Sequence, residues 1–215
     1  MKVCGLTRVE DARHAAESGA DYLGAILTEG FGRSIAPERA RAFADLGLPV
    51  VGVLVDPTTA DATTRARAAA ASVLQLHGDE PPALLDALRT EGDWQIWKAV
   101  RPRTVDDLRR AIAGYAEHAD ALLVDGWHAE LKGGSGTRFD WELVARVRGE
   151  IPHGLALVAA GGLTAANVAD AMAALAPDVV DVSSGVESSP GHKDPAQVEA
   201  FIRAARGRAA LEEAR

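Results

Sequence analysis

The sequence predicts an α/β fold, a single (β/α)8 barrel of the TIM-barrel type that spans residues 1–215 as one domain. Two observations predict it. Short runs rich in Val, Ile, Leu and Ala alternate with longer segments of helical period, and the alternation repeats eight times along the chain. From the second run on, the runs are almost continuously apolar, which is typical of parallel strands covered on both faces. An open, doubly wound sheet is the alternative, and the repeat count favours the barrel.

The expected strands are short and aliphatic. They span residues 2–4, 22–27, 50–55, 73–76, 95–100, 121–125, 155–160 and 179–183. Along the last of them, Val179, Asp181 and Ser183 alternate with Val180 and Val182. Because successive side chains of a strand point to opposite faces, the polar set is expected to face the barrel mouth and the other two valines to pack on helices.

Several of the expected helices start with a capping residue or an early proline. They span residues 9–18, 37–45, 58–70, 81–89, 105–118, 141–148, 165–175 and 195–206. The expected capping residues are Thr7, Thr104, Asp140, Thr164 and Asp194. The longest connection without a helical pattern covers residues 126–139, a length typical of a functional lid.

The composition is that of an ordinary globular protein. Hydrophobic residues make up 47% of the chain and charged residues 25%, and no linker rich in Pro, Gly or Ser divides it. The sequence shows neither a signal-peptide pattern nor an apolar run of membrane-spanning length, and its one cysteine excludes an intramolecular disulfide. We therefore expect a cytoplasmic protein with no membrane partner.

The formal net charge of −8 argues against a nucleic-acid partner, because a surface that binds a polyanion normally concentrates Lys and Arg. The same charge constrains a phosphate ligand. Since the field of the whole protein opposes an anion, attraction must come from backbone N–H groups and a few placed cations.

Two glycine-containing turns follow the last two expected strands. Gly161 and Gly162 join one strand to a helix start, and Ser183, Ser184 and Gly185 repeat the arrangement one unit later. Glycine lets the backbone approach a ligand closely, and the N–H groups of a helix N-terminus point at an anion. Barrels commonly hold phosphate after strands seven and eight, so we expect these five residues to bind phosphate.

Reactive side chains fall at the carboxyl ends of other strands, where barrel enzymes have their active sites. Cys4 ends the first strand, although a cysteine in a strand is more often a small buried hydrophobe. Asp125 ends an apolar run and is either a capping or loop-fixing residue or a placed acid. Arg33 is either an exposed loop cation or the fork that holds a substrate carboxylate. His77 follows the fourth strand and could simply satisfy loop carbonyls.

Specific motifs lie in order along essentially the whole chain. They are KVCGLT at residues 2–7, QLHG at 75–78, GGSG at 133–136 with FDW at 139–141, AGGL at 160–163 with NV at 167–168, and DVSSGVE at 181–187 with PG at 190–191 and KD at 193–194. Together they resemble the motifs of the phosphoribosylanthranilate isomerases. The resemblance implies a (β/α)8 aldose–ketose isomerase of tryptophan biosynthesis that converts N-(5-phosphoribosyl)anthranilate to 1-(2-carboxyphenylamino)-1-deoxyribulose 5-phosphate. This Amadori rearrangement needs no metal and no organic cofactor.

The resemblance also implies roles for single residues. By position, Cys4 matches the family's general base and Asp125 its general acid. The acid must carry a proton near neutral pH in a partly apolar mouth, and the base must be a thiolate, a form that Arg33 and Lys2 would favour. Arg33 matches the arginine that holds the anthranilate carboxylate. Further substrate contacts are expected from Gln75, His77 and Asp181.

Some alternatives stay open. The family pattern usually has a serine at the position of Phe31 and a bulkier residue at Ser34, so a phosphosugar isomerase with a changed aromatic substrate is one alternative. A non-catalytic phosphate-binding homologue is another. The histidine-pathway aminoaldose isomerase resembles a pair of aspartates on strands one and five, where this chain has Cys4 and Lys98. A metal-dependent epimerase would need a cluster of His and carboxylates at strand ends, and the sequence offers none with suitable spacing.

The expected partner is therefore a small-molecule phosphorylated aminosugar, with no metal, nucleic acid or membrane. The sequence leaves both a monomer and a homodimer open.

Overall fold

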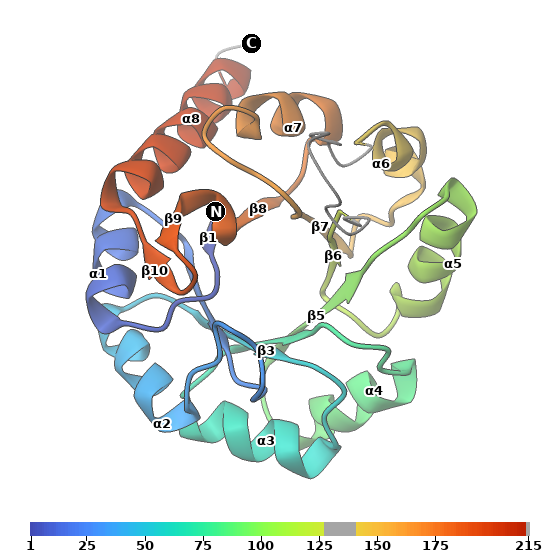
Figure 1. The fold of residues 1–215 in the computed structure, drawn as a ribbon. Helices are drawn as coiled ribbons and strands as arrows, with labels where there is room; N and C mark the ends of the chain where they lie inside the picture. The colour runs from blue at the N-terminus through green and yellow to red at the C-terminus, as the bar shows by residue number, and fades with distance from the viewer. Residues whose placement is uncertain (127–140, 214–215) are drawn as a thin grey trace.

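Eight parallel strands close into a barrel, and the helices form a ring around it (Figure 1). The structure, a computed structural model, describes residues 1–126 and 141–213, with the backbone alone from residue 208. Each strand pairs with the next in the sequence, and β8 pairs with β1, with Lys2 opposite Asp181. The predicted (β/α)8 fold is confirmed.

All eight expected strands are present. They are β1 (Lys2–Val3), β2 (Tyr22–Ile26), β3 (Val50–Leu54), β4 (Val73–Leu76), β5 (Gln95–Val100), β6 (Ala121–Val124), β7 (Ala156–Ala159) and β8 (Val179–Val182). An antiparallel hairpin of β9 (Glu187–Ser189) and β10 (His192–Lys193) follows β8. Cys4, Asp125 and Ala160, the expected last residues of three strands, still donate backbone hydrogen bonds to neighbouring strands. The expected strand ends therefore hold to within one residue.

The helices follow the strands in alternation. They are α1 (Val9–Ser18), α2 (Pro37–Ala40), α3 (Thr59–Ala68), α4 (Pro82–Glu91), α5 (Val105–Tyr115), α6 (Trp141–Val147), α7 (Val168–Leu175) and α8 (Pro195–Glu213). Three 3-10 turns accompany them: η1 (Arg41–Leu46), η2 (Arg148–Glu150) and η3 (Ser184–Val186). The helix expected at residues 37–45 is thus divided into α2 and η1, and the last helix continues beyond residue 206. Within the described part of the chain, no helix is long and apolar enough to cross a membrane.

The expected helix caps are only partly correct. Thr104 accepts a hydrogen bond from Asp107 N, and Asp107 accepts one from Thr104 N, which forms a reciprocal cap on α5. Asp194 accepts hydrogen bonds from the first N–H groups of α8. Thr7 does not cap α1. Its hydroxyl donates instead to Gly191 O at 2.6 Å, which ties the first loop to the hairpin.

The start of α7 also differs from the prediction. Thr164 does not cap a helix, because the side chain of Asn167 accepts from Thr164 N at 2.8 Å and donates to Gly162 O at 3.0 Å. These two bonds hold a turn between β7 and the helix, so α7 begins at Val168 rather than at residue 165.

Apolar side chains form two layers, one inside the barrel and one between the strands and the helices. On β8, Val180 and Val182 pack in the outer layer and Val179 packs inside, as strand alternation predicts. The inner layer consists mainly of Val51, Val73, Trp97, Ala99, Ala121, Leu123, Val158 and Ala160. This layer closes the barrel below the carboxyl ends of the strands and forms the floor on which a site can be built.

Candidate functional site

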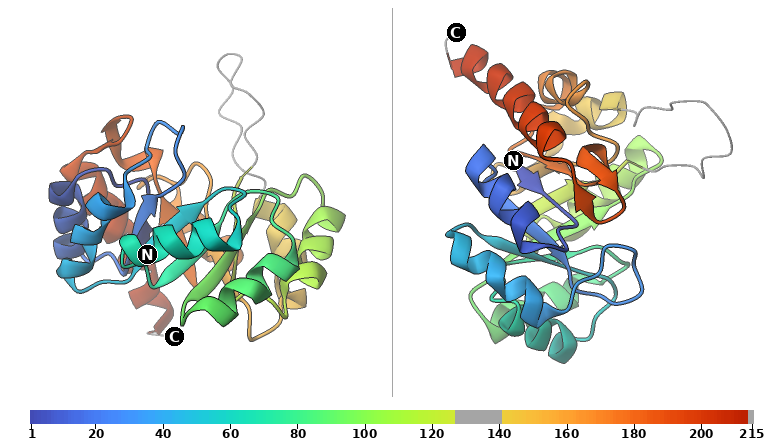
Figure 2. Two further views of the ribbon diagram at one scale, coloured as in Figure 1. Left: turned by 90° about the horizontal axis from the view of Figure 1, so that it is seen from below. Right: turned by 60° about the vertical axis from the view of Figure 1, so that its left-hand side comes forward.

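A cavity of about 320 Å³ opens at the carboxyl ends of the strands. The loop between β2 and α2 and the β9–β10 hairpin rise at this same end of the barrel (Figure 2). The structure brings together all the residues expected to act in catalysis, substrate contact or phosphate binding. The cavity is lined by Cys4, Arg33, Gln75, His77, Asp125, Gly161, Gly162, Asp181, Ser183, Ser184 and Gly185, among others.

Cys4 lies at this cavity beside a buried ion pair. Lys2 Nζ donates to Asp181 Oδ2 at 3.0 Å, and the two side chains are 0% and 9% exposed. Gly24 provides the space, since a Cβ there would lie 2.9 Å from Cys4 Sγ and 3.0 Å from Lys2 Cε. Alanine at this position would push into both groups.

The electrostatics around the thiol are opposed. Burial raises the pKa of the Cys4 thiol above its ordinary value, the charge of Lys2 lowers it, and the charge of Asp181 raises it again. Burial also disfavours the Lys2 ammonium, but Asp181 and Cys4 outweigh this and raise the pKa of Lys2. Lys2, one of the cations expected to favour the thiolate, therefore lies next to Cys4. Burial nevertheless favours the neutral thiol.

Asp125 follows β6 and faces two nitrogen-bearing side chains. Its Oδ2 lies 3.3 Å from His77 Nε2 and 3.6 Å from Arg101 Nε. On the other side of the ring, His77 Nδ1 lies 2.8 Å from Gln75 Nε2. With the amide nitrogen as donor, His77 carries its proton on Nε2 and donates to Asp125. The His77 ring thus hydrogen-bonds to the Asp125 carboxyl group and orients it, instead of bonding to a loop carbonyl.

Gln75 and Asp181 each have a buried acceptor atom that the described part of the chain leaves without a hydrogen-bond partner. Neither Gln75 Oε1 nor Asp181 Oδ1 has a hydrogen-bond donor among the described residues. An unsatisfied buried acceptor costs about 1–3 kcal/mol. Both atoms are therefore suited to accept hydrogen bonds from the hydroxyl groups of a ligand.

The backbones of the turns after β7 and β8 lie close to each other. Gly161 and Gly162 adopt positive φ angles of 87° and 65°. A Cβ at Gly185 would lie 1.9 Å from Leu163 O, so only glycine fits there. The first turn leads into the Asn167 turn and not directly into α7, so the backbone N–H groups at this strand end belong to a turn rather than to a helix N-terminus.

Behind β4, a second buried ion pair fixes the turn that carries His77. Lys98 Nζ lies 2.9 Å from Glu80 Oε2 and donates to Gly78 O at 2.7 Å, and both charged side chains are at most 2% exposed. Glu80 in turn accepts hydrogen bonds from Gly78 N and Asp56 N. Lys98 therefore lies on the outer face of β5 and supports the site from behind.

Sequence reasoning assigned no site role to several residues that line the cavity or lie directly behind its wall. Arg101 directly follows β5, and this position at a strand end was the available signal. Phe31 lines the mouth with 48% of its surface exposed. Glu187 and Lys193 were noted only as parts of a motif, yet Glu187 holds Arg33 through two hydrogen bonds. Contacts between loops so far apart in sequence leave no local pattern.

Residues 127–140, which contain most of the expected lid, the GGSG motif and the expected cap Asp140, lie outside the described residues. In the remainder of the chain, no group of three or more His, Cys, Asp or Glu is arranged to hold a metal ion.

Known proteins resemble the chain over almost its full length. The family model for N-(5'-phosphoribosyl)anthranilate (PRA) isomerase matches residues 1–204. An N-(5'-phosphoribosyl)anthranilate isomerase of Pseudomonas putida (strain W619) is 41% identical over 209 residues, which cover 94% of this chain and 95% of the relative.

Solved structures agree with the sequence comparison. Phosphoribosyl anthranilate isomerase from Thermotoga maritima superposes with a TM-score of 0.86 at 36% identity, covering 96% of this chain and 98% of that one. A phosphoribosyl anthranilate isomerase in complex with reduced 1-(o-carboxyphenylamino)-1-deoxyribulose 5-phosphate superposes with a TM-score of 0.83 at 33% identity, covering 96% and 97%. The chain therefore belongs to the phosphoribosylanthranilate isomerase family.

Proposed function

We propose that the protein isomerises N-(5-phosphoribosyl)anthranilate to 1-(2-carboxyphenylamino)-1-deoxyribulose 5-phosphate in tryptophan biosynthesis, with Cys4 as general base and Asp125 as general acid. The observation that carries the proposal is that both side chains line one cavity, together with Arg33 and the two glycine turns. A base, an acid, a carboxylate fork and an anion pocket are the four elements that this substrate requires.

The reaction begins with ring opening. Asp125 donates a proton to the ribose ring oxygen, and the nitrogen lone pair forms a cationic imine with C1′. The Cys4 thiolate then removes the C2′ proton. The C–H electron pair becomes the C1′=C2′ bond of an enolamine, and the imine π electrons return to nitrogen. Protonation at C1′ and loss of the C2′ hydroxyl proton give the ketone.

Contacts in the cavity position Asp125 and place a positive charge beside Cys4. The hydrogen bond from His77 Nε2 holds the Asp125 carboxyl in the cavity. The thiol of Cys4 is buried next to the Lys2 ammonium, and the cationic imine adds a second positive charge once the ring is open. A positive charge nearby favours the thiolate, so ring opening increases the fraction of Cys4 that has lost its proton to solvent and can act as the base.

The remaining residues fit the rest of the substrate. The turns at Gly161 and Gly185 offer close backbone approach for the phosphate. Gln75 Oε1 and Asp181 Oδ1, the buried acceptors without partners among the described residues, suit sugar hydroxyls. Arg33 suits the anthranilate carboxylate.

The test is turnover. The fluorescence of the anthranilate substrate is expected to decay with the purified protein. Cys4→Ala and Asp125→Asn are each expected to lower kcat by roughly 10²- to 10⁴-fold, with unchanged circular dichroism and thermal unfolding. Near-normal kcat in either folded variant would remove that residue from its role. A flat signal with the unchanged protein would exclude this isomerase activity and leave the non-catalytic phosphate-binding alternative.

Growth gives an independent check. The gene is expected to rescue a strain that lacks the tryptophan-pathway isomerase, and the Cys4→Ala variant is expected not to rescue it. Rescue by both would show that another group acts as the base.

A further inference from the structure

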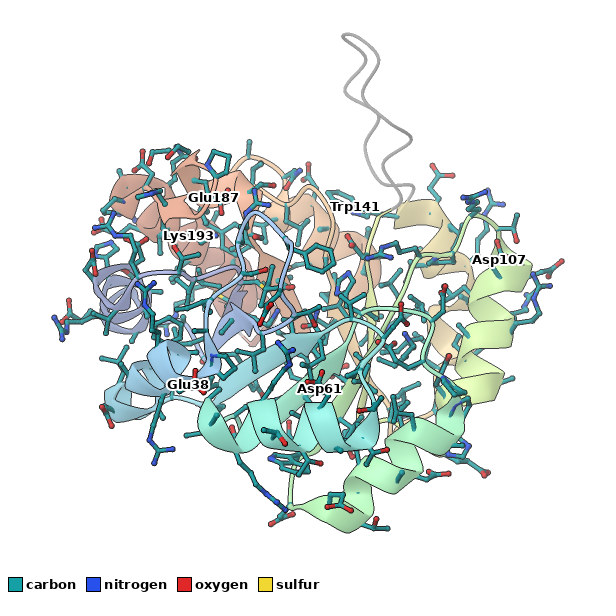
Figure 3. The ribbon with its side chains drawn as sticks, turned by 60° about the horizontal axis from the view of Figure 1, so that its bottom comes forward. Glu38, Asp61, Asp107, Trp141, Glu187 and Lys193 are labelled. Atoms are coloured by element: carbon teal, nitrogen blue, oxygen red, sulfur yellow. The ribbon has the colours of Figure 1, made fainter. Side chains whose placement is uncertain are left out.

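Arg33 belongs to a network of three charged side chains, with Glu187 and Lys193. Its Nε and Nη2 each donate to a different oxygen of Glu187 at 2.7 Å. Lys193 Nζ donates to Glu187 Oε1 at 2.9 Å and to Ser183 O at 3.0 Å. Figure 3 shows Glu187 and Lys193 close together at the hairpin end of the molecule. This network links the loop after β2 with the end of β8.

Burial of the three side chains increases from Arg33 at the solvent-facing end to Lys193 at the inner end. The side chain of Arg33 is 30% exposed, whereas those of Glu187 and Lys193 are 5% and 2% exposed. The backbone N of Lys193 is also held, by Asp11 Oδ2 at 3.2 Å. Arg33 is therefore the member that reaches the cavity, and the other two are fixed behind it.

The charge states follow from the contacts. Burial opposes ionisation of Glu187, but hydrogen bonds from Arg33 and Lys193 and their charges lower its pKa to about 2. The hydrogen bond to Glu187 raises the pKa of Arg33. Burial lowers the pKa of Lys193, and Glu187 opposes this effect. Lys193 donates to two acceptors, as an ammonium group does.

The charge balance matters for a carboxylate ligand. A two-bond pair between Arg33 and Glu187 orients the guanidinium well, but the pair alone is neutral. A neutral pair attracts a carboxylate weakly. The ammonium of Lys193 adds one positive charge, so the three side chains together carry a net charge of +1 toward the cavity.

We propose that Glu187 and Lys193 are positioning residues that make Arg33 a receptor for the carboxylate of the substrate's aromatic part. Glu187 fixes the plane of the guanidinium, and Lys193 offsets the charge of Glu187. This inference rests on the proposed function, because it takes the carboxylate of anthranilate as the group that Arg33 recognises.

The experiment compares two ligands by titration calorimetry: the reduced product analogue with its ortho-carboxyl group, and the same compound without it. The carboxylate preference is the ratio of the two dissociation constants. Because the ligands share phosphate and sugar, a general loss of structure weakens both and leaves the ratio unchanged.

Lys193→Met is expected to lower the preference by about tenfold, the effect of one unit charge several ångströms away in partly screened surroundings. KM for the substrate should rise by the same factor with little change in kcat. The double variant Glu187→Gln/Lys193→Met restores the net charge of +1 and is expected to return the preference to within about threefold of the unchanged protein. A purely structural role predicts a further loss in the double variant.

Lys193→Gln provides the same test in a side chain that keeps hydrogen-bonding capacity, should the methionine variant not fold. An unchanged preference in either folded variant, or a lower preference in the double variant than in the single one, would overturn this inference alone. Equal binding of the two ligands by the unchanged protein would overturn the proposed substrate as well.

Discussion

Lys2 Nζ donates a hydrogen bond to Asp181 Oδ2 at 3.0 Å inside the barrel, in direct proximity to Cys4. The ion pair places charges of opposite sign beside one thiol. Their effects on the thiol oppose each other, and burial adds to that of the carboxylate. The reactivity of Cys4 is therefore set by a balance that substitution can shift in either direction.

The first prediction concerns that balance. The rate of Cys4 alkylation by iodoacetamide should rise with pH through an inflection above the ordinary thiol value of 9.0, because burial raises the pKa. Lys2→Met should move the inflection higher, and Asp181→Asn should move it lower. The chain has one cysteine, so mass spectrometry follows a single site. An inflection below 9.0 in the unchanged protein would contradict this description of the site.

The second prediction concerns stability in acid. The folded-state pKa of Glu187 is about 2, against an ordinary value of 4.5. A depressed carboxyl pKa contributes stability that is present above pH 4.5 and is lost as the pH falls toward 2. In urea unfolding, the free energy of unfolding of Glu187→Gln should therefore decline less steeply over this interval than that of the unchanged protein. Parallel curves would show that Glu187 contributes nothing to acid unfolding.

The third prediction concerns the close backbone approach at the turns after β7 and β8, where we propose that phosphate binds. Gly185→Ala should destabilise the fold by about 1–3 kcal/mol and weaken the binding of inorganic phosphate, because its Cβ would lie 1.9 Å from Leu163 O. Gly154→Ala is the matched control, since nothing lies within 4 Å of the added carbon. The effect of Gly154→Ala on the free energy of unfolding should stay within about 0.5 kcal/mol. Equal effects of the two substitutions on phosphate binding would argue against a phosphate site at this turn.

The fourth prediction concerns Phe31 at the mouth of the cavity. Phe31 stands exposed at the mouth, and its backbone is fixed by reciprocal bonds, Phe31 N to Ser34 Oγ at 3.0 Å and Ser34 N to Phe31 O at 2.9 Å. An aromatic pair contributes about 0.5–1.5 kcal/mol beyond area burial. Phe31→Ser should thus raise KM by roughly 3- to 10-fold with little change in kcat. Val9→Ser, at an exposed apolar residue on α1, should change neither constant, and an unaltered KM in Phe31→Ser would exclude ring contact.

Much of the fold could be predicted from the sequence because a barrel depends on local patterns. Continuous apolar runs define parallel strands, and closure then brings every strand end to one mouth. This is why Cys4 and Asp125, which stand 121 positions apart, line the same cavity. No contact between them had to be known in advance.

The parts that were missed depend on contacts between separate loops or on a choice between competing side chains. Arg33 and Glu187 are 154 residues apart, and neither position carries a signal for the other. At the start of α7, Thr164 was the better capping residue by type, but the Asn167 side chain bonds to Thr164 N and holds a turn. Arg101 stands at a strand end without a motif around it, so only the folded structure shows it near Asp125.

The most direct test of the proposed acid and base is the primary kinetic isotope effect with substrate deuterated at C2′. In Cys4→Ser the removal of the C2′ proton becomes slower, so the isotope effect on turnover should increase over that of the unchanged protein. In Asp125→Asn ring opening becomes rate-limiting, and the effect should shrink toward unity. The reverse pattern, or equal effects in both variants, would contradict the assignment of Cys4 as base and Asp125 as acid.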